Sequence, residues 1–219
     1  METIDTCPFP PWEDPSFGFI CMDTDQTTAK EKVLTAMSHP DTVMFTDASA
    51  RNGLLGATMI MMDSRDNVCT VWPINVGPDW KWSIHAAELV AIYHAIELAM
   101  QVQRSSPSQQ PTTYTVFSDS EKALQALSKP SSKSGYHIVQ STTRIAHEAK
   151  RLLQITIRLI WIPSHSGIKG NEEADRVAKA SVSETSSHGF QRLASLQRKA
   201  IRRDTLQKWK QEWKESTKG

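Results

Sequence analysis

The spacing of apolar side chains changes abruptly between residues 41 and 103 of this 219-residue chain. The segment TVMFTDAS (42–49) places Val43, Phe45 and Asp47 on one face, which is the two-residue period of a β-strand. Two further strand-like runs follow, LLGATMIMM and VCTVWPI, and the turn-rich segment DSRDN separates them. Residues 82–103 then adopt a helical period. We therefore expect a three-stranded antiparallel meander followed directly by a helix.

That helix has a plausible N-cap at Ser83 and one apolar stripe, formed by Ile84, Ile92, Ala95, Ile96 and Ala99. Strands and helices alternate after it: a strand at 113–119, helices at 120–128 and 136–153, a strand at 154–162 and a helix from about Asn171. Helices between strands imply parallel crossovers. The pattern predicts an α/β fold with a mixed five-stranded sheet, three antiparallel strands plus parallel ones, flanked by helices.

The chain length suits one domain with appendages. We expect residues 1–40 to be an irregular N-terminal extension with one short helix-like stretch at 27–39, and residues 41–181 to form the domain. Residues 182–219 read as a linker and a basic amphipathic helix. From residue 190 onward the chain has nine Lys and Arg and only three acids, a local net charge of +6, although the whole chain carries only +1. Trp209 and Trp213 could dock this helix onto the domain or contact nucleic acid directly, and we favour docking.

Several protein classes are disfavoured by composition. Three cysteines without a CxxC spacing argue against a disulfide-linked partner and against a zinc site. The acidic, Pro-broken N-terminus does not resemble a signal peptide, and the apolar runs are too short to span a bilayer. We expect an intracellular protein, nuclear or cytoplasmic and not secreted, and favour a monomer with no membrane partner.

Four acids occupy positions where acids are unusual: Asp47, Glu88, Asp119 and Asp175. Asp47 shares a face with apolar strand residues, and Glu88 lies in the apolar stripe of its helix, where an unpaired carboxylate is costly. Asp119 follows an apolar strand at its carboxyl end, where ligands gather in α/β sheets. Asp175 is expected in the first turn of the last helix.

Each acid also has an ordinary explanation. Asp119 could cap the next helix, and Asp175 could be a surface acid that the helix dipole favours. Asp47 could begin a polar turn, and Glu88 could pair with a buried Arg or Lys. One shared cause explains the four together more simply. Oxygen ligands without cysteine suit a hard divalent cation, Mg²⁺ or Mn²⁺, and two such ions are the usual arrangement for phosphodiester hydrolysis.

The segment WIPSHSGIKGNEEADRVAK (161–179) adds a histidine to these acids. His165 lies ten positions before Asp175, in a glycine-containing loop that opens onto the last helix. An imidazole there suits proton transfer near a bound metal. The other histidines are scattered, and we interpret them as surface or packing residues.

The order TDAS (46–49), AAEL (86–89), SDS (118–120) and IPSHSGIKGNEEAD (162–175) resembles the type 1 ribonuclease H domain. The form of the last motif is similar to ribonuclease H domains of non-LTR retrotransposon reverse transcriptases, particularly fungal ones. The resemblance covers about residues 41–181. It implies that Asp47, Glu88, Asp119 and Asp175 are metal-binding catalytic carboxylates and that His165 assists proton transfer and product release. Asn171 and Glu172 would support the site from its rim.

The resemblance further implies endonucleolytic cleavage of the RNA strand of RNA–DNA hybrids with two Mg²⁺ (or Mn²⁺) ions, leaving 5′-phosphate ends. Contacts to 2′-hydroxyl groups would distinguish RNA from DNA. The candidate contacts lie in an expected loop at 48–52 and near the last two motifs: Ala48, Ser49, Asn52, Ser120 and Asn171.

The chain departs from this family pattern without losing a catalytic acid. Ala48 and Ser164 replace common glycines, Glu121 adds a negative charge beside Asp119-Ser120, and the basic helix-loop of many cellular ribonucleases H is missing. The basic tail could supply the substrate binding that this helix-loop would otherwise provide. The alternatives are a catalytically silent, retroelement-derived hybrid-binding module and an interaction domain that acts through its C-terminal helix. A transposase or integrase is disfavoured by Glu88 and the His165 loop.

Overall fold

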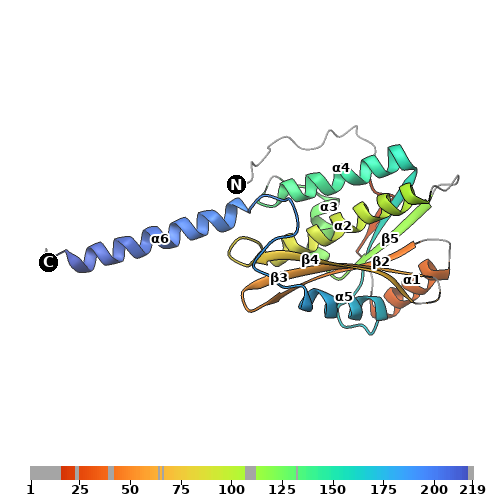
Figure 1. Cartoon of the computed structure of the whole chain (residues 1–219), viewed down its shortest axis with the longest axis horizontal. Coiled ribbons are helices and arrows are strands. Elements are labelled where there is room, and N and C mark those ends of the chain that lie inside the picture. Colours follow the sequence, from red (N-terminus) through yellow and green to blue (C-terminus); the bar gives the residue numbers. More distant parts are fainter. Residues whose placement is uncertain are drawn as a thin grey trace.

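A computed structural model describes residues 16–22, 25–38, 42–63, 65, 67–106, 112–131 and 133–216. It shows a mixed sheet with helices on both faces and one long helix that projects from the body (Figure 1). The strands are β1 (Phe19–Cys21), β2 (Thr42–Arg51), β3 (Leu54–Met62), β4 (Val68–Pro78), β5 (Thr112–Ser118) and β6 (Ile155–Trp161). The helices are α1 (Gln26–Ser38), α2 (Ile84–Ser105), α3 (Glu121–Ser128), α4 (Tyr136–Leu153), α5 (Lys169–Ala180) and α6 (Ala194–Glu215).

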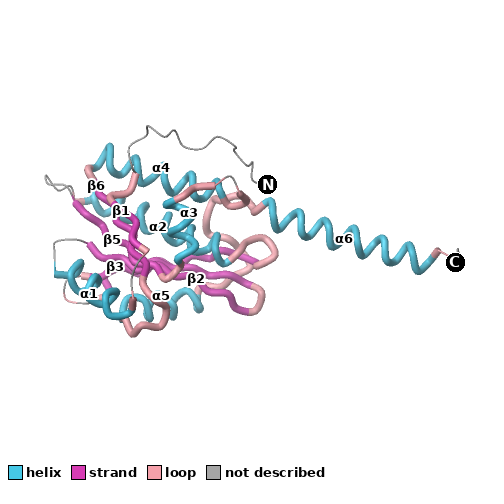
Figure 2. The backbone as a smooth tube through the Cα atoms, turned by 180° about the vertical axis from the view of Figure 1, so that it is seen from behind, coloured by secondary structure: helices cyan, strands magenta, loops and turns pink. Residues whose placement is uncertain are grey.

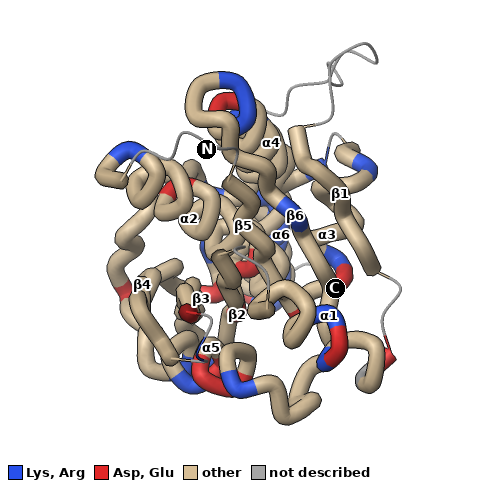
Figure 3. Tube along the Cα trace, turned by 90° about the vertical axis from the view of Figure 1, so that its right-hand side faces the viewer, with Lys and Arg blue, Asp and Glu red and all other residues tan. Residues whose placement is uncertain are grey.

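The sheet has the order β1-β6-β5-β2-β3-β4, which Figure 3 shows from one edge to the other. The predicted meander is present, because β2 pairs antiparallel with β3 and β3 with β4. The remaining pairs, β2 with β5, β5 with β6 and β6 with β1, are parallel. The register places Thr46 opposite Ser118, so Asp47 and Asp119 follow paired positions on neighbouring strands. The mixed, helix-flanked sheet of the prediction is confirmed.

Both faces of the sheet are buried, which explains the dense apolar content of its central strands. Helices α2, α3 and α4 cover one face, and α1 and α5 cover the other (Figures 1 and 3). Successive residues of β2 serve opposite faces: Met44 packs beneath α2, whereas Phe45 packs beneath α5. Phe45 stacks on Phe117 of β5 with ring centroids 5.3 Å apart. These layers hold β2 and β5 side by side, and their carboxyl ends lie next to the start of α2.

Two expectations about the elements were wrong. Residues 1–40 are not simply an irregular extension, because β1 adds a sixth strand at the edge of the sheet. A three-residue strand is too short to show a period, and its place depends on pairing with β6 rather than on local sequence. The helix-like stretch at 27–39 corresponds to α1, and residues 1–15 lie outside the described residues. Ile84 begins α2 but is 44% exposed, so the buried stripe starts at Ala86.

The segment after α5 is fixed to the edge strand β4 before α6 begins. The Ser187 amide donates to the Asn75 carbonyl over 2.8 Å, and the Ser186 hydroxyl donates to the Val76 carbonyl over 2.6 Å. Phe190 then packs edge-to-face on Tyr93 of α2, with centroids 5.0 Å apart. We call residues 186–193 the β4 clasp. It secures the start of α6 to the body.

Beyond the clasp, α6 leaves the body (Figures 1 and 2). Leu193 and Ala194 are buried, but Trp209 and Trp213 are 69% and 82% exposed. The expected docking of these two tryptophans onto the domain was therefore wrong. None of the described helices has the length and apolar content needed to cross a membrane.

His188 makes the β4 clasp sensitive to pH. Its ring packs edge-to-face on Trp82, with centroids 4.6 Å apart, and burial lowers its pKa from 6.5 to about 4. Because the folded protein holds this imidazole neutral, its contribution to stability is complete above pH 6.5 and is lost as the pH falls toward 4. We expect the advantage of wild type over His188→Gln in unfolding free energy to shrink by about 2 kcal/mol between pH 7.5 and 4.5.

Denaturant titrations of both proteins at each pH measure this difference. The acidic residues elsewhere titrate equally in the two proteins, so their contribution cancels. A difference that does not change with pH would contradict the assignment.

Candidate active site

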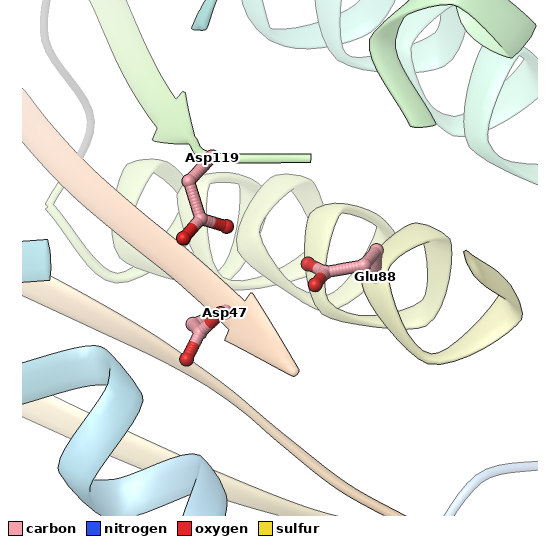
Figure 4. Close-up of side chains that lie close together, drawn as sticks. All are labelled: Asp47, Glu88 and Asp119. Carbon is pink, nitrogen blue, oxygen red and sulfur yellow. The ribbon is translucent and has the colours of Figure 1, made fainter. Parts of the chain in front are cut away.

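Three carboxylates from three elements converge where the parallel pairing of β2 with β5 ends. Asp47 lies within β2, Glu88 lies in the second turn of α2, and Asp119 directly follows β5. One side-chain oxygen from each lies within 4.8 Å of the other two. Figure 4 shows Asp47 and Asp119 side by side, with Glu88 of α2 pointing toward them. The parallel pairing of β2 with β5 and the packing of α2 on β2 produce this arrangement.

The burial of this group makes its negative charge costly. Asp47 is 5% exposed and Glu88 6%. Burial, with the nearby charges of Asp119 and Asp175, raises the pKa of Asp47 from 3.8 to about 7. Burial followed by repulsion from Asp47 and Asp119 raises the pKa of Glu88 well above 4.5. Such shifts are typical of sites where function, not stability, determines the residue.

The donor set fits a hard divalent cation. All three candidate ligands are carboxylates, and Glu88 Oε2 is buried without a hydrogen-bond partner among the described residues. A cation would satisfy that oxygen and offset the repulsion among the three charges. The group can therefore hold a metal ion.

The ordinary explanations for these three acids do not match their surroundings. Asp47 lies inside a strand, not at a turn. The carboxylate of Asp119 accepts a hydrogen bond from the Ser164 hydroxyl at 2.8 Å, and the N-cap of α3 is Ser120. Among the described residues, no cation is one of the groups that shift the pKa of Glu88.

Asp175 lines the same cleft but lies apart from the group of three. Helix α5 begins at Lys169, two residues before the expected Asn171, so Asp175 falls in its second turn rather than its first. Its carboxylate accepts a hydrogen bond from Lys179 Nζ at 2.6 Å. Asp175 is nevertheless close enough to raise the pKa of Asp47.

The loop between β6 and α5 brings His165 to the cleft. His165 has a positive φ of 52°, a conformation that side chains other than glycine adopt infrequently. The carboxylate of Glu172 accepts from the Gly167 amide at 3.4 Å and so braces the loop from α5. Asn171 also lines the cleft, but it is buried rather than at the rim, and within the described part of the chain its Oδ1 has no hydrogen-bond partner.

The cleft has a volume of about 460 Å³, within the range of ligand sites. Of the proposed substrate contacts, Ala48, Ser120 and Asn171 line it, whereas Ser49 and Asn52 do not. The expected loop at 48–52 is instead the end of β2, with a turn beginning at Asn52, because β2 continues to Arg51.

Two residues that line the cleft, His85 and Lys122, were not predicted as part of the site. Burial, with the charge of Lys122, lowers the pKa of His85. The available signal was helical spacing, because His85 lies three residues before Glu88 and thus shares its face. Glu121, next to Lys122, also lines the cleft and pairs with Gln125 at 2.7 Å.

Solved structures with the same fold include LC11-RNase H1, isolated from compost by a metagenomic approach. It is 18% identical over 66% of this chain and 96% of its own, with a TM-score of 0.50. The same protein in complex with RNA/DNA hybrid matches at 17% identity over 65% and 96% of the two chains, also with a TM-score of 0.50. The foamy viral protease-reverse transcriptase in complex with RNA/DNA hybrid matches at 13% identity and a TM-score of 0.51, over 66% of this chain and 20% of its own. At such low identities, the structural likeness shows a shared fold alone.

No curated protein matches the chain significantly. The family model of RNase H, however, matches residues 39–183, well over half of the chain. That span contains every carboxylate of the cleft and the His165 loop. The chain therefore belongs to the RNase H family.

Proposed function

We propose that this protein is a metal-dependent endonuclease that hydrolyses the RNA strand of RNA–DNA hybrids and leaves 5′-phosphate ends. The observation that carries the proposal is the convergence of Asp47, Glu88 and Asp119 within 4.8 Å, in a chain of the RNase H family. The complexes of LC11-RNase H1 and the foamy viral enzyme with RNA/DNA hybrids support the substrate class.

In this proposal Asp47, Glu88 and Asp119 hold Mg²⁺ or Mn²⁺, and Asp175 completes the ligand set from α5. When bound as a pair, these ions would activate the attacking water and neutralise the developing charge on the phosphate. His165, on its loop at the mouth of the cleft, accepts or returns a proton at the leaving group. Asn171 supports the wall of the cleft from α5, and Ala48 and Ser120 contact the RNA strand.

Ser164 orients a carboxylate of the metal group in this proposal. Its hydroxyl donates to Asp119 over 2.8 Å, so it holds this carboxylate in one orientation beside the metal group. Retrotransposon origin stays a prediction from the sequence motifs.

The test is cleavage of end-labelled substrates by the full chain with Mg²⁺ or Mn²⁺. We expect cutting within the RNA of an RNA–DNA hybrid and none of single-stranded RNA, duplex RNA or duplex DNA. Chelation of the metal should stop cutting, and the products should carry 5′-phosphates.

Two results would contradict the proposal. Metal-independent cutting, or equal cutting of single-stranded RNA, would exclude this mechanism. Hybrid binding without cutting under either metal would instead favour the silent binding module.

A further inference from the structure

Helix α6 extends the molecule beyond the folded body. Its 22 residues give a length of about 33 Å at the usual rise. It leaves from the end of the molecule toward which β2 and β5 run (Figure 1), and its base lies near the start of α2, because His188 of the clasp packs on Trp82. Every described residue from Ile201 to Ser216 is exposed. The described part of the body therefore leaves this part of the helix uncovered.

The basic and aromatic residues of α6 share one face of the helix, and the acidic residues lie outside it. At 3.6 residues per turn, one face of about 160° carries six cations and three apolar side chains from Arg198 onward. These are Arg198, Lys199, Arg202, Arg203, Leu206, Trp209, Lys210, Trp213 and Lys214. The three acids, Asp204, Glu212 and Glu215, lie outside this face, together with Lys208. We call the first set the basic aromatic face.

The base of α6 is fixed to the body. The β4 clasp joins β4 through Ser187 and Asn75, and Leu193 is buried at the end of the clasp. The first turn is held as well, because the Ser195 amide donates to the Ser134 hydroxyl at 3.1 Å. The clasp therefore sets the direction in which the basic aromatic face leaves the body.

The chemistry of this face fits single-stranded nucleic acid. Cations along one side of a helix attract a phosphate backbone, and exposed indole rings one turn apart offer surfaces on which unpaired bases stack. A membrane-surface helix needs a continuous apolar face. Here Arg202 shares the stripe of Trp209 and Trp213, which interrupts any such face. Pairing with a second copy would bring like charges together.

We propose that α6 binds the single-stranded nucleic acid that flanks the hybrid, with its cations on phosphates and with Trp209 and Trp213 stacked on bases. The proposal rests on the proposed function for the identity of the adjoining hybrid. It does not depend on cleavage. An RNA overhang and a DNA overhang both offer the required phosphates and bases, and the experiment uses each.

The test measures binding by the full chain, without divalent metal, to one hybrid that is either blunt or extended by an overhang of about 12 nucleotides. We expect the overhang to tighten binding roughly 10-fold or more at moderate salt. Trp209→Leu/Trp213→Leu, which keeps an apolar helix but removes both rings, should abolish most of that gain. Circular dichroism confirms that α6 remains helical.

A matched pair tests the face itself. Lys210→Gln and Lys208→Gln remove the same charge from the same helix, but only Lys210 belongs to the basic aromatic face. We expect Lys210→Gln to weaken overhang binding and to lower the salt slope by about 0.7, and Lys208→Gln to change neither.

Three results would overturn the proposal. The first is no gain in affinity from an overhang, and the second is an equal effect of Lys210→Gln and Lys208→Gln. The third is a tryptophan variant that keeps overhang binding and loses only its binding to phosphatidylserine vesicles or its self-association. Metal-dependent cleavage of the blunt hybrid, measured on the same variants, separates the two proposals. Cleavage without an overhang preference removes only the role of α6. An overhang preference without cleavage removes only the proposed nuclease.

Discussion

Asp47→Asn is expected to abolish hybrid cleavage, with a loss of at least about 10³-fold in rate, because it removes the buried carboxylate shared by the metal group. The substitution keeps the shape of the side chain and should leave the fold intact. Cleavage of labelled hybrid at saturating Mg²⁺, under single-turnover conditions, measures the loss. Asp79→Asn makes the same chemical change at an exposed acid outside the cleft and should leave the rate within about twofold of wild type.

The same variant should be more stable than wild type when no divalent metal is present. The folded pKa of Asp47 is raised to about 7, so its ionisation disfavours the folded state as the pH rises above 4. We therefore expect the gain from Asp47→Asn to be absent near pH 4 and to reach about 2–4 kcal/mol near pH 8.

Added Mg²⁺ should stabilise wild type and not the variant, because only wild type keeps all three carboxylate ligands. An inactive variant with unchanged stability at both pH values would mean that Asp47 is neither buried nor repelled as the structure indicates. An active variant would remove Asp47 from the mechanism.

The central fold could be predicted because its strands show their period in the sequence. β2 alternates between two buried faces, and α2 has a stripe wide enough to identify it. β1 could not be found this way, since three residues give no period and the pairing partner β6 lies far away in the chain. The β4 clasp was missed for a similar reason: Ser186 and Ser187 hold it through hydrogen bonds to the backbone of β4, which no side-chain pattern records.

The candidate site was predicted from acids at apolar positions, and the structure brings Asp47, Glu88 and Asp119 together. His85 and Lys122 were missed because an isolated histidine or lysine on a helix has many ordinary uses. The error about Trp209 and Trp213 has a general cause. Periodicity shows which residues share a helix face, but it does not show whether that face meets the rest of the protein.

Gly56→Ala is expected to be strongly destabilising, by about 2–3 kcal/mol, although replacing glycine in a strand usually has the opposite sign. Gly56 lies in β3 directly beneath the end of α5. A Cβ there would contact the carbonyl oxygen of Ala178 and would lie 2.7 Å from the carbonyl carbon of Ser181. Both contacts are backbone, so no side-chain rotation relieves them, and α5 must move away from the sheet.

The consequence reaches the cleft because α5 also carries Asn171 and Asp175. Displacing α5 should therefore lower hybrid cleavage even at temperatures where Gly56→Ala remains folded. A loss of stability alone would leave cleavage unchanged at those temperatures. Gly189→Ala is the matched control, since a Cβ at Gly189 meets no atom of the described residues within 4 Å. It should change the unfolding free energy by less than about 0.5 kcal/mol and leave cleavage unchanged. If Gly56→Ala matched this control in both measurements, the close packing of α5 on β3 would not be what places Asp175 at the site.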